Sequence, residues 1–370
     1  MKVLLLADVN SIHAQRWAVS LYDRGIGIGI FSLNRPKQNV AGSPEFFSKP
    51  IPVFYPYRLK ADLSASGLIT KIKYLTVIMS LRKAIKTFDP DIVHAHYASS
   101  YGTLLSLSGF QPGIISLWGS DIFDFPKRSL LTKSLLKFNI SRAGMILSTS
   151  NAMAAEAANY TKKQIKIIPF GIDPEKFKPG TTASLFNHGD FVIGTVKALE
   201  PEYGIEFLIR SFALLCDKHA EFPLRLLIVG DGSLVKPLKK LAESTGYGDL
   251  ILFAGKALHE EIPKYLNMMD VFAALSLSES FGVSVIEASA CELPVVVTSI
   301  GGLKEVAEDM VTGLLVPPAT IIEPADAFEK LIFNTGFRKQ LGRNGRLRVE
   351  KMFNWKDNVE EMIKTYQLLI

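Results

Sequence analysis

The chemically most suggestive stretch of this 370-residue sequence runs from Ser276 to Pro294 and carries two carboxylates, Glu279 and Glu287. A polar turn, Ser278 to Gly282, precedes an apolar periodic run, Val283 to Cys291, which predicts a helix with one buried face. Free backbone N–H groups and the positive end of the helix dipole would favour a phosphate group at this turn. The two glutamates are just over two helical turns apart, so both can point along one side. The spacing suits a sugar and a ribose, with a diphosphate between them.

Strand-like apolar runs alternate with helical periods along the whole chain, which is typical of α/β folds with parallel sheets. The expected strands are 2–7, 26–33, 51–54, 92–95, 113–117, 145–149 and 165–168 in a first series, and 191–196, 224–229, 251–254, 271–274 and 295–298 in a second. The Pro- and Gly-rich segment Pro169 to Pro179 divides the series. We therefore predict two doubly wound, Rossmann-like sheets, each binding ligands at the carboxyl ends of its strands, with the ligand cleft between them.

The corresponding domain boundaries follow from these signals. We expect an N-terminal domain over 1–170, a linker over 171–189 and a C-terminal domain over 190–354. The terminal helix over 355–370 is expected to pack back on the first domain.

The run S-L-S-E-S-F-G-V-S-V-I-E-A at 276–288 resembles the signature of the retaining GT-B glycosyltransferases of family 4, the glycosyl transferases of group 1. The linker sequence PFGIDPEKFKP extends the resemblance, which covers nearly the whole chain, closely from 165 to 320 and loosely before. The resemblance implies a GT-B fold and transfer of a sugar, of hexose type, from a nucleoside-diphosphate sugar that is most often UDP-linked. The second domain would bind this donor, and the first would bind the acceptor.

The same resemblance implies roles for individual residues. Glu279 would contact the donor sugar, and Glu287 would bind the ribose hydroxyls through charged hydrogen bonds. The other donor-binding residues expected are Ser280, Phe281, Gly282, Gly301 and Gly302 around the diphosphate, and Lys256 where backbone groups would read the base.

One segment departs from the family pattern. Ala198 and Tyr203 stand where an Arg and a Lys are expected to bind the diphosphate, and Lys197 is the only cation nearby in the sequence. We predict that Lys197 takes over this catalytic role. The alternative is that the phosphates rely on backbone amides and helix dipoles alone.

Loops after the strands of the first domain are expected to hold the acceptor. Asn10, His13 and Arg16 follow the first strand, and Trp118 stands where the family often has a His near the reacting carbon. Asp121 is the best carboxylate in this domain for a catalytic role, although the leaving phosphate can itself take the acceptor proton.

Two histidines, His94 and His96, lie on the strand DIVHAHY. We expect them to point to opposite faces, with His96 in the catalytic set and His94 packed in the sheet, and therefore not to form a metal pair. The only D-x-D sequence, Asp89-Pro90-Asp91, is interpreted as the end of a helix. We predict a metal-independent enzyme without a cofactor.

The charge is unevenly distributed. Residues 1–172 hold 21 Lys and Arg against 9 Asp and Glu, a net charge of +12, whereas residues 173–370 carry −6. The basic residues of 58–88 and 127–142 are interleaved with apolar ones, which predicts either a surface for anionic membranes or ordinary helices with a buried apolar stripe. The first interpretation favours a lipid-linked acceptor, as in bacterial surface polysaccharide synthesis. No nucleic-acid partner is expected.

Cys216 and Cys291 lie far apart in the sequence, which indicates a reducing compartment, and no uncharged apolar run reaches 18 residues. We expect a cytoplasmic protein, peripheral on the inner face of the cell membrane if it binds lipid. Two other functions stay open at this point, a GT-B nucleotide-sugar epimerase and a non-catalytic sugar-nucleotide-binding protein.

Overall fold

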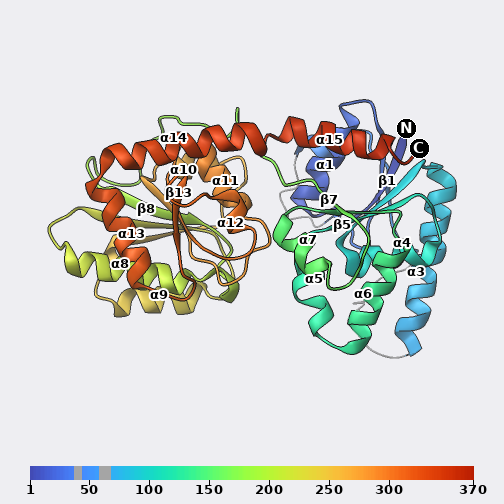
Figure 1. The fold of residues 1–370 in the computed structure, drawn as a ribbon, viewed down its shortest axis with the longest axis horizontal. Coiled ribbons are helices and arrows are strands. Elements are labelled where there is room, and N and C mark those ends of the chain that lie inside the picture. Colours follow the sequence, from blue (N-terminus) through green and yellow to red (C-terminus); the bar gives the residue numbers. More distant parts are fainter. Residues whose placement is uncertain (37–43, 58–67) are drawn as a thin grey trace. The chain divides into compact units, whose positions relative to one another are not determined.

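The computed structural model describes residues 1–36, 44–57 and 68–370. Within these ranges the chain forms two compact units, unit 1 (Met1–Ile168 with Val359–Ile370) and unit 2 (Pro169–Asn358). Each unit contains one parallel sheet with helices on both faces (Figure 1). The predicted fold class of two Rossmann-like α/β domains is confirmed.

Unit 1 is built on a seven-stranded sheet in the order β3-β2-β1-β4-β5-β6-β7. Its strands are β1 (Lys2–Leu6), β2 (Gly27–Phe31), β3 (Val53–Phe54), β4 (Ile92–His96), β5 (Gly113–Leu117), β6 (Met145–Ser148) and β7 (Ile165–Ile167). Its helices are α1 (Ile12–Tyr22), α2 (Pro44–Ser48), α3 (Leu68–Phe88), the π-helix η1 (Tyr97–Tyr101), α4 (Gly102–Ser108), α5 (Ser120–Phe123), the 3₁₀-helix η2 (Phe125–Lys127), α6 (Leu130–Arg142) and α7 (Asn151–Ala157).

Unit 2 is built on a six-stranded sheet in the order β10-β9-β8-β11-β12-β13. Its strands are β8 (Phe191–Val196), β9 (Leu224–Val229), β10 (Ile251–Gly255), β11 (Val271–Ala274), β12 (Val295–Thr298) and β13 (Gly313–Val316). Its helices are η3 (Pro201–Tyr203), α8 (Ile205–Lys218), α9 (Val235–Ser244), η4 (Gly248–Leu250), α10 (Ile262–Leu266), α11 (Val283–Ala290), α12 (Leu303–Val306), α13 (Ile322–Phe333) and α14 (Thr335–Met352). The sequence did not predict β13.

Helix α15 (Trp355–Gln367) begins in unit 2, and its residues from Val359 onward belong to unit 1. In unit 1, α1 and α15 cover one face of the sheet, and α3, α4 and α6 cover the other (Figure 1). Apolar side chains from alternate strand positions fill the layer under α3, α4 and α6, as a strand period of two requires. This alternation decides which side chains of β4 face α15.

The apolar stripe of α3 enters this core in the part that the structure describes. Val77, Ile78 and Leu81 are buried, whereas Met79 is exposed. The side chains at the start of α3 that contribute to the predicted membrane surface lie outside the described part of the structure. They are Leu68, Lys71, Ile72, Lys73 and Leu75. The described half of α3 thus favours the ordinary core helix over the membrane-binding one. In the described ranges, no helix is both long and apolar enough to cross a bilayer.

Candidate functional site

The strand order of unit 2 reverses between β8 and β11, and ligands of open α/β sheets bind where the order reverses, at the carboxyl ends of the strands. Lys197 directly follows β8, and Glu279 lies in the turn after β11. Their ammonium and carboxylate groups form an ion pair, and each side chain is only 11% exposed. The Lys197 Nζ atom also lies 4.5 Å from the centroid of the Tyr203 ring, within range of a cation–π contact. Two residues predicted separately to be catalytic therefore meet at this position.

The turn that holds Glu279 is fixed by backbone contacts to its neighbours. The Leu277 amide donates to the Glu202 carbonyl oxygen at 2.7 Å, and the Gly302 amide donates to the Glu279 carbonyl oxygen at 3.1 Å. Gly301 has a φ of +40°, and a Cβ there would collide with the Glu279 carbonyl oxygen. This close approach of two backbones explains why two glycines occupy this position.

Helix α11 starts directly after this turn. Its N-cap, Gly282, has a φ of +102°, a backbone conformation that residues other than glycine rarely adopt. Phe281 is buried and makes edge contacts with the rings of Phe170 and Phe353, at centroid distances of 5.9 and 5.7 Å. The structure thus gathers Ser280, Phe281, Gly282, Gly301 and Gly302 around one helix start, where the positive end of the helix dipole favours an anion.

The second carboxylate, Glu287, is held by a residue that the sequence analysis missed. The Oε1 atom of Glu287 lies 2.9 Å from Nε2 of His259, and the other ring nitrogen, Nδ1, lies 3.1 Å from Nζ of Lys176. The Phe177 ring packs against the imidazole in a tilted arrangement, with the ring centroids 5.5 Å apart. With Lys176 donating to Nδ1, the neutral ring donates Nε2–H to the carboxylate. His259 therefore orients a buried Glu287.

His259 could have been noticed from its place in the sequence. It lies in the loop after β10, at the same edge of the sheet as the other site residues. Lys256, the residue that we selected from this loop, has an exposed side chain. Nothing local in the sequence indicates which of the two side chains turns toward Glu287.

In unit 1 the strand order reverses between β1 and β4, and the loop after β1 lies at this point. Asp8 organises the loop, because its Oδ1 accepts hydrogen bonds from the Asn10 amide and side chain at 2.9 and 3.0 Å, and its Oδ2 accepts from Asn34 at 2.8 Å. His13 and Arg16 lie on the first turns of α1, both half-buried. The His13 ring contacts the edge of the Trp118 ring, 6.0 Å between centroids.

Trp118 is the centre of an aromatic cluster that also includes a residue we had not predicted. The centroid of its ring lies 4.4 Å from the centroid of the His96 ring and 5.3 Å from that of the Tyr97 ring. Tyr97 has a φ of +71°, which is strained for an aromatic residue, and it starts the π-helix η1. Such strain accumulates at functional positions, so Tyr97 joins the candidates of unit 1.

The prediction that His94 and His96 face opposite sides of the sheet is wrong. Residues two apart on a strand share a face, and the centroids of the two rings lie only 5.0 Å apart. His94 bonds to the Tyr366 hydroxyl of α15 at 2.8 Å and to Ser116 Oγ at 2.7 Å, and burial lowers its pKa to about 3. His96 is 2% exposed, and burial and then the neighbouring His94 hold its pKa well below the usual value.

Asp121 has a clear structural role. Its Oδ2 accepts from the Ala98 amide at 2.7 Å, and its Oδ1 accepts from the amides of Trp118 and Gly119 at 3.2 and 2.9 Å. Burial raises its pKa, and these amides oppose the shift. The carboxylate joins the loops after β4 and β5. Catalytic roles for Asp121 and His96 stay predictions, and the geometry explains both residues as supports of the aromatic cluster.

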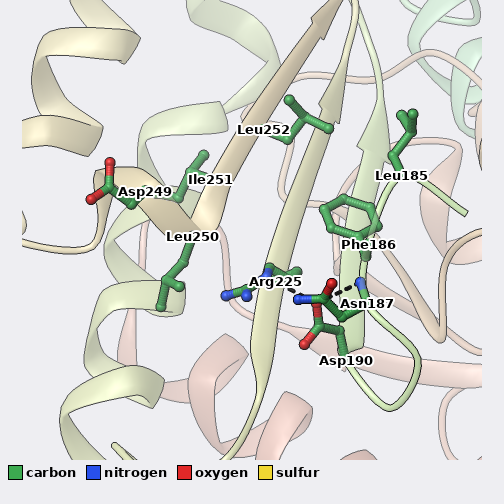
Figure 2. A pocket seen from close by; sticks show the side chains of 9 residues that line it. All are labelled: Leu185, Phe186, Asn187, Asp190, Arg225, Asp249, Leu250, Ile251 and Leu252. Atoms are coloured by element: carbon green, nitrogen blue, oxygen red, sulfur yellow. Dashed lines mark hydrogen bonds and ion pairs between the residues drawn. The ribbon is translucent and has the colours of Figure 1, made fainter.

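A pocket of about 250 Å³ lies at the other end of the unit 2 strands (Figure 2). Arg225 of β9 pairs with Asp190 at 3.0 Å on its wall, and Asp190 directly precedes β8. Its remaining lining residues are Leu185, Phe186, Asn187, Asp249, Leu250, Ile251 and Leu252. No residue predicted to be functional lines this pocket.

Comparison with known proteins identifies relatives for both units. Residues 181–348 match the family model of the glycosyl transferases group 1, and residues 2–150 match that of the glycosyl transferase 4-like proteins. An uncharacterised glycosyltransferase of Methanocaldococcus jannaschii is 30% identical over 286 residues, which cover 75% of this chain and 76% of that protein. A D-inositol 3-phosphate glycosyltransferase of Corynebacterium jeikeium is 32% identical over 227 residues, 58% of this chain and 54% of that protein.

Solved structures share the fold over the full chain. Sucrose-phosphate synthase from Thermosynechococcus elongatus superposes with a TM-score of 0.82 at 20% identity, covering 100% of this chain and 99% of that one. The Anabaena protein HepE, solved in complex with UDP, has a TM-score of 0.82 at 19% identity, covering 100% of both chains.

Proposed function

Because the chain belongs to the glycosyl transferases of group 1 and is a GT-B glycosyltransferase, we propose that it transfers a hexose from UDP-sugar, with retention of configuration and without a metal ion. The observation that carries the proposal is the contact between Lys197 and Glu279 at the point where the strand order of unit 2 reverses. HepE, a structural neighbour, has been solved with UDP and with UDP-glucose, which supports a uridine donor.

Each part of the donor has a partner in this proposal. The diphosphate lies at the start of α11, where the amides of the Ser280–Gly282 turn and the helix dipole attract negative charge. Lys197 supplies the positive charge that the expected Arg and Lys would have supplied, and Tyr203 lies against it in place of that Lys. Glu287, oriented by His259, accepts hydrogen bonds from the ribose hydroxyls.

The chemical step needs charge stabilisation more than a strong base. The bond between the anomeric carbon and the diphosphate oxygen breaks, and a bond to an acceptor hydroxyl oxygen forms on the same face of the sugar. The acceptor proton passes to the departing phosphate oxygen. Negative charge grows on that phosphate in the transition state, so Lys197 stabilises the transition state more than the bound donor. Glu279 fixes the Lys197 ammonium and is released to the sugar hydroxyls when the diphosphate binds.

The acceptor is a glycan or a lipid-linked molecule that binds unit 1 at Asn10, His13, Arg16 and the ring cluster of Trp118. Assembly of bacterial surface polysaccharide would use such an acceptor. A cytoplasmic location fits the two cysteines, Cys216 and Cys291, which are free thiols and form no disulfide. Burial raises the pKa of each thiol to about 12, so neither is expected to react.

Two measurements test the proposal in sequence. Thermal shift with UDP-, GDP- and ADP-linked sugars should select a UDP-sugar, and a donor at about 100 times its dissociation constant adds roughly 2.7 kcal/mol to the free energy of unfolding. Free UDP should then appear only when an acceptor is added. Conversion of the sugar without acceptor would indicate an epimerase, and binding without any turnover would indicate a sugar-nucleotide-binding protein.

A further inference from the structure

The most exposed large apolar side chains among the described residues lie side by side at the start of α6. Leu130 is 83% exposed and Leu131 is 82% exposed, and Phe138, two turns along the helix, is 42% exposed. Large apolar groups at this exposure are unfavourable in water, and when they are clustered they mark an interaction surface.

Exposed cations lie close to these apolar groups in the sequence. The exposed side chains of Lys127, Arg128, Lys133 and Lys137 flank them, and no acidic residue occurs between Asp124 and Glu156 in the sequence. None of the ion pairs formed among the described residues involves these four cations. We call the surface formed by Lys127, Arg128, Leu130, Leu131, Lys133, Lys137 and Phe138 the α6 tip.

The rest of unit 1 holds the α6 tip firmly in this orientation. Leu136 and Ile140, on the opposite side of the helix, are buried in the core. The buried Asn139 amide donates to the Ala98 carbonyl oxygen and to Thr103 Oγ1, both at 2.8 Å. Ser129 caps the helix with a capping box that includes Thr132. The leucines are therefore exposed because the helix is anchored by its other face, not because its end is frayed.

We propose that the α6 tip docks the protein on a membrane that contains anionic lipid, with Leu130 and Leu131 entering the acyl boundary and the four cations contacting headgroup phosphates. Exposed apolar groups with exposed cations close to them in the same helix end match the layering of a bilayer surface, in which anionic headgroups cover the hydrocarbon. A protein partner with an acidic rim would need the same charges but would not need two adjacent leucines that are more than 80% exposed. The proposal does not depend on which sugar or nucleotide the enzyme uses.

The test is flotation of the full chain with vesicles of phosphatidylcholine alone and with vesicles that also contain 30% phosphatidylglycerol. We expect the wild type to bind the anionic vesicles. The variant Leu130→Ser/Leu131→Ser should bind at least tenfold more weakly, because serine, unlike leucine, gains no favourable free energy on transfer from water into the acyl region. The matched control is Leu347→Ser on α14, a leucine that is 63% exposed in unit 2 and should bind as the wild type does.

The charge part of the proposal has its own matched pair. Lys133→Ser/Lys137→Ser on α6 removes two cations one helical turn apart, and should weaken binding about fivefold per cation. Lys236→Ser/Lys240→Ser removes two exposed lysines at the same spacing on α9 and should leave binding unchanged. Tryptophan introduced by Leu131→Trp should shift its emission to the blue only with anionic vesicles.

Several results would overturn the proposal. Equal binding to both vesicle types, an equal loss in the α6 and α9 variants, or no emission shift would each reject membrane docking. Self-association of the wild type that Leu130→Ser/Leu131→Ser abolishes would assign the surface to a second copy of this chain. Stabilisation by UDP-sugar should be the same in every variant, so failure of the α6 tip can be distinguished from failure of the proposed function.

Discussion

Changing Glu287 and His259 tests how the nucleotide is bound, because the two residues have different expected effects. Glu287→Gln keeps the shape of the side chain and removes its charge. Hydrogen bonds to a charged group are worth roughly 1.5–3 kcal/mol, so UDP affinity should fall about 10- to 150-fold. His259→Ala leaves the carboxylate charged but takes away the 2.9 Å contact that orients it. Because His259 acts on the ribose only through Glu287, its loss should weaken UDP binding less than Glu287→Gln does, by roughly 2- to 12-fold, or about 0.5–1.5 kcal/mol.

The assay is calorimetric titration with UDP and with 2′,3′-dideoxy-UDP, which lacks the ribose hydroxyls. Both variants should bind the dideoxy analogue as the wild type does, because the analogue makes no bond to Glu287. His259→Gln, whose amide can reach the position of Nε2, should recover part of the affinity that His259→Ala loses. The matched analogue separates a local effect on the ribose from a general effect on folding.

Two outcomes would refute this reasoning. If Glu287→Gln binds UDP with wild-type affinity, the carboxylate does not hold the ribose. If both variants lose equal affinity for UDP and for the dideoxy analogue, His259 and Glu287 act through the loop structure instead.

Three further predictions concern the remaining parts of the structure. Lys197→Ala should lower kcat more than it raises KM, and activity should survive a chelator; restoration of lost activity by magnesium would contradict the proposed mechanism. Tyr366→Phe should leave donor affinity unchanged but lower the free energy of unfolding by about 1–3 kcal/mol, seen as a lower melting temperature, because it strips a buried His94 nitrogen of its partner. Burial lowers the pKa of His94 to about 3, so as the pH falls below about 6.5 only the unfolded chain binds a proton at this residue. The free energy of unfolding should therefore be roughly 2 kcal/mol lower at pH 5 than at pH 7. Equal stability to urea at the two pH values would exclude a neutral, buried His94.

The sequence alone determined the order and type of most elements. Strand and helix periods are local properties, so the alternation that defines two doubly wound sheets can be seen without any tertiary contact. The basic and apolar stretch over 127–142, for which a helix was one of the expectations, contains helix α6 (Leu130–Arg142). His94 and His96 were placed on opposite faces of β4 only because the period of two was misapplied. Strand β13 was missed because its sequence, GLLV, contains a glycine and only one β-branched residue, which is a weak strand signal.

The contacts within the site were decided by the tertiary structure. Lys197 and Glu279 are 82 residues apart in the chain, and His259 and Glu287 are 28 apart. The sequence suggested three of these four residues individually, but no local pattern indicates which side chains meet. They meet because parallel strands place all their carboxyl ends at one edge of a sheet, and the strand order decides which loops become neighbours there.

The exposed leucines of the α6 tip illustrate the same division. The sequence shows that 127–142 is basic and contains several apolar residues at helical spacing. It cannot show which of them are covered, because burial depends on the elements that pack against the helix. Leu136 and Ile140 face the core of unit 1, and this leaves Leu130 and Leu131 in solvent. Local periodicity determines that a helix forms, whereas only long-range packing determines which of its faces is left to bind a partner.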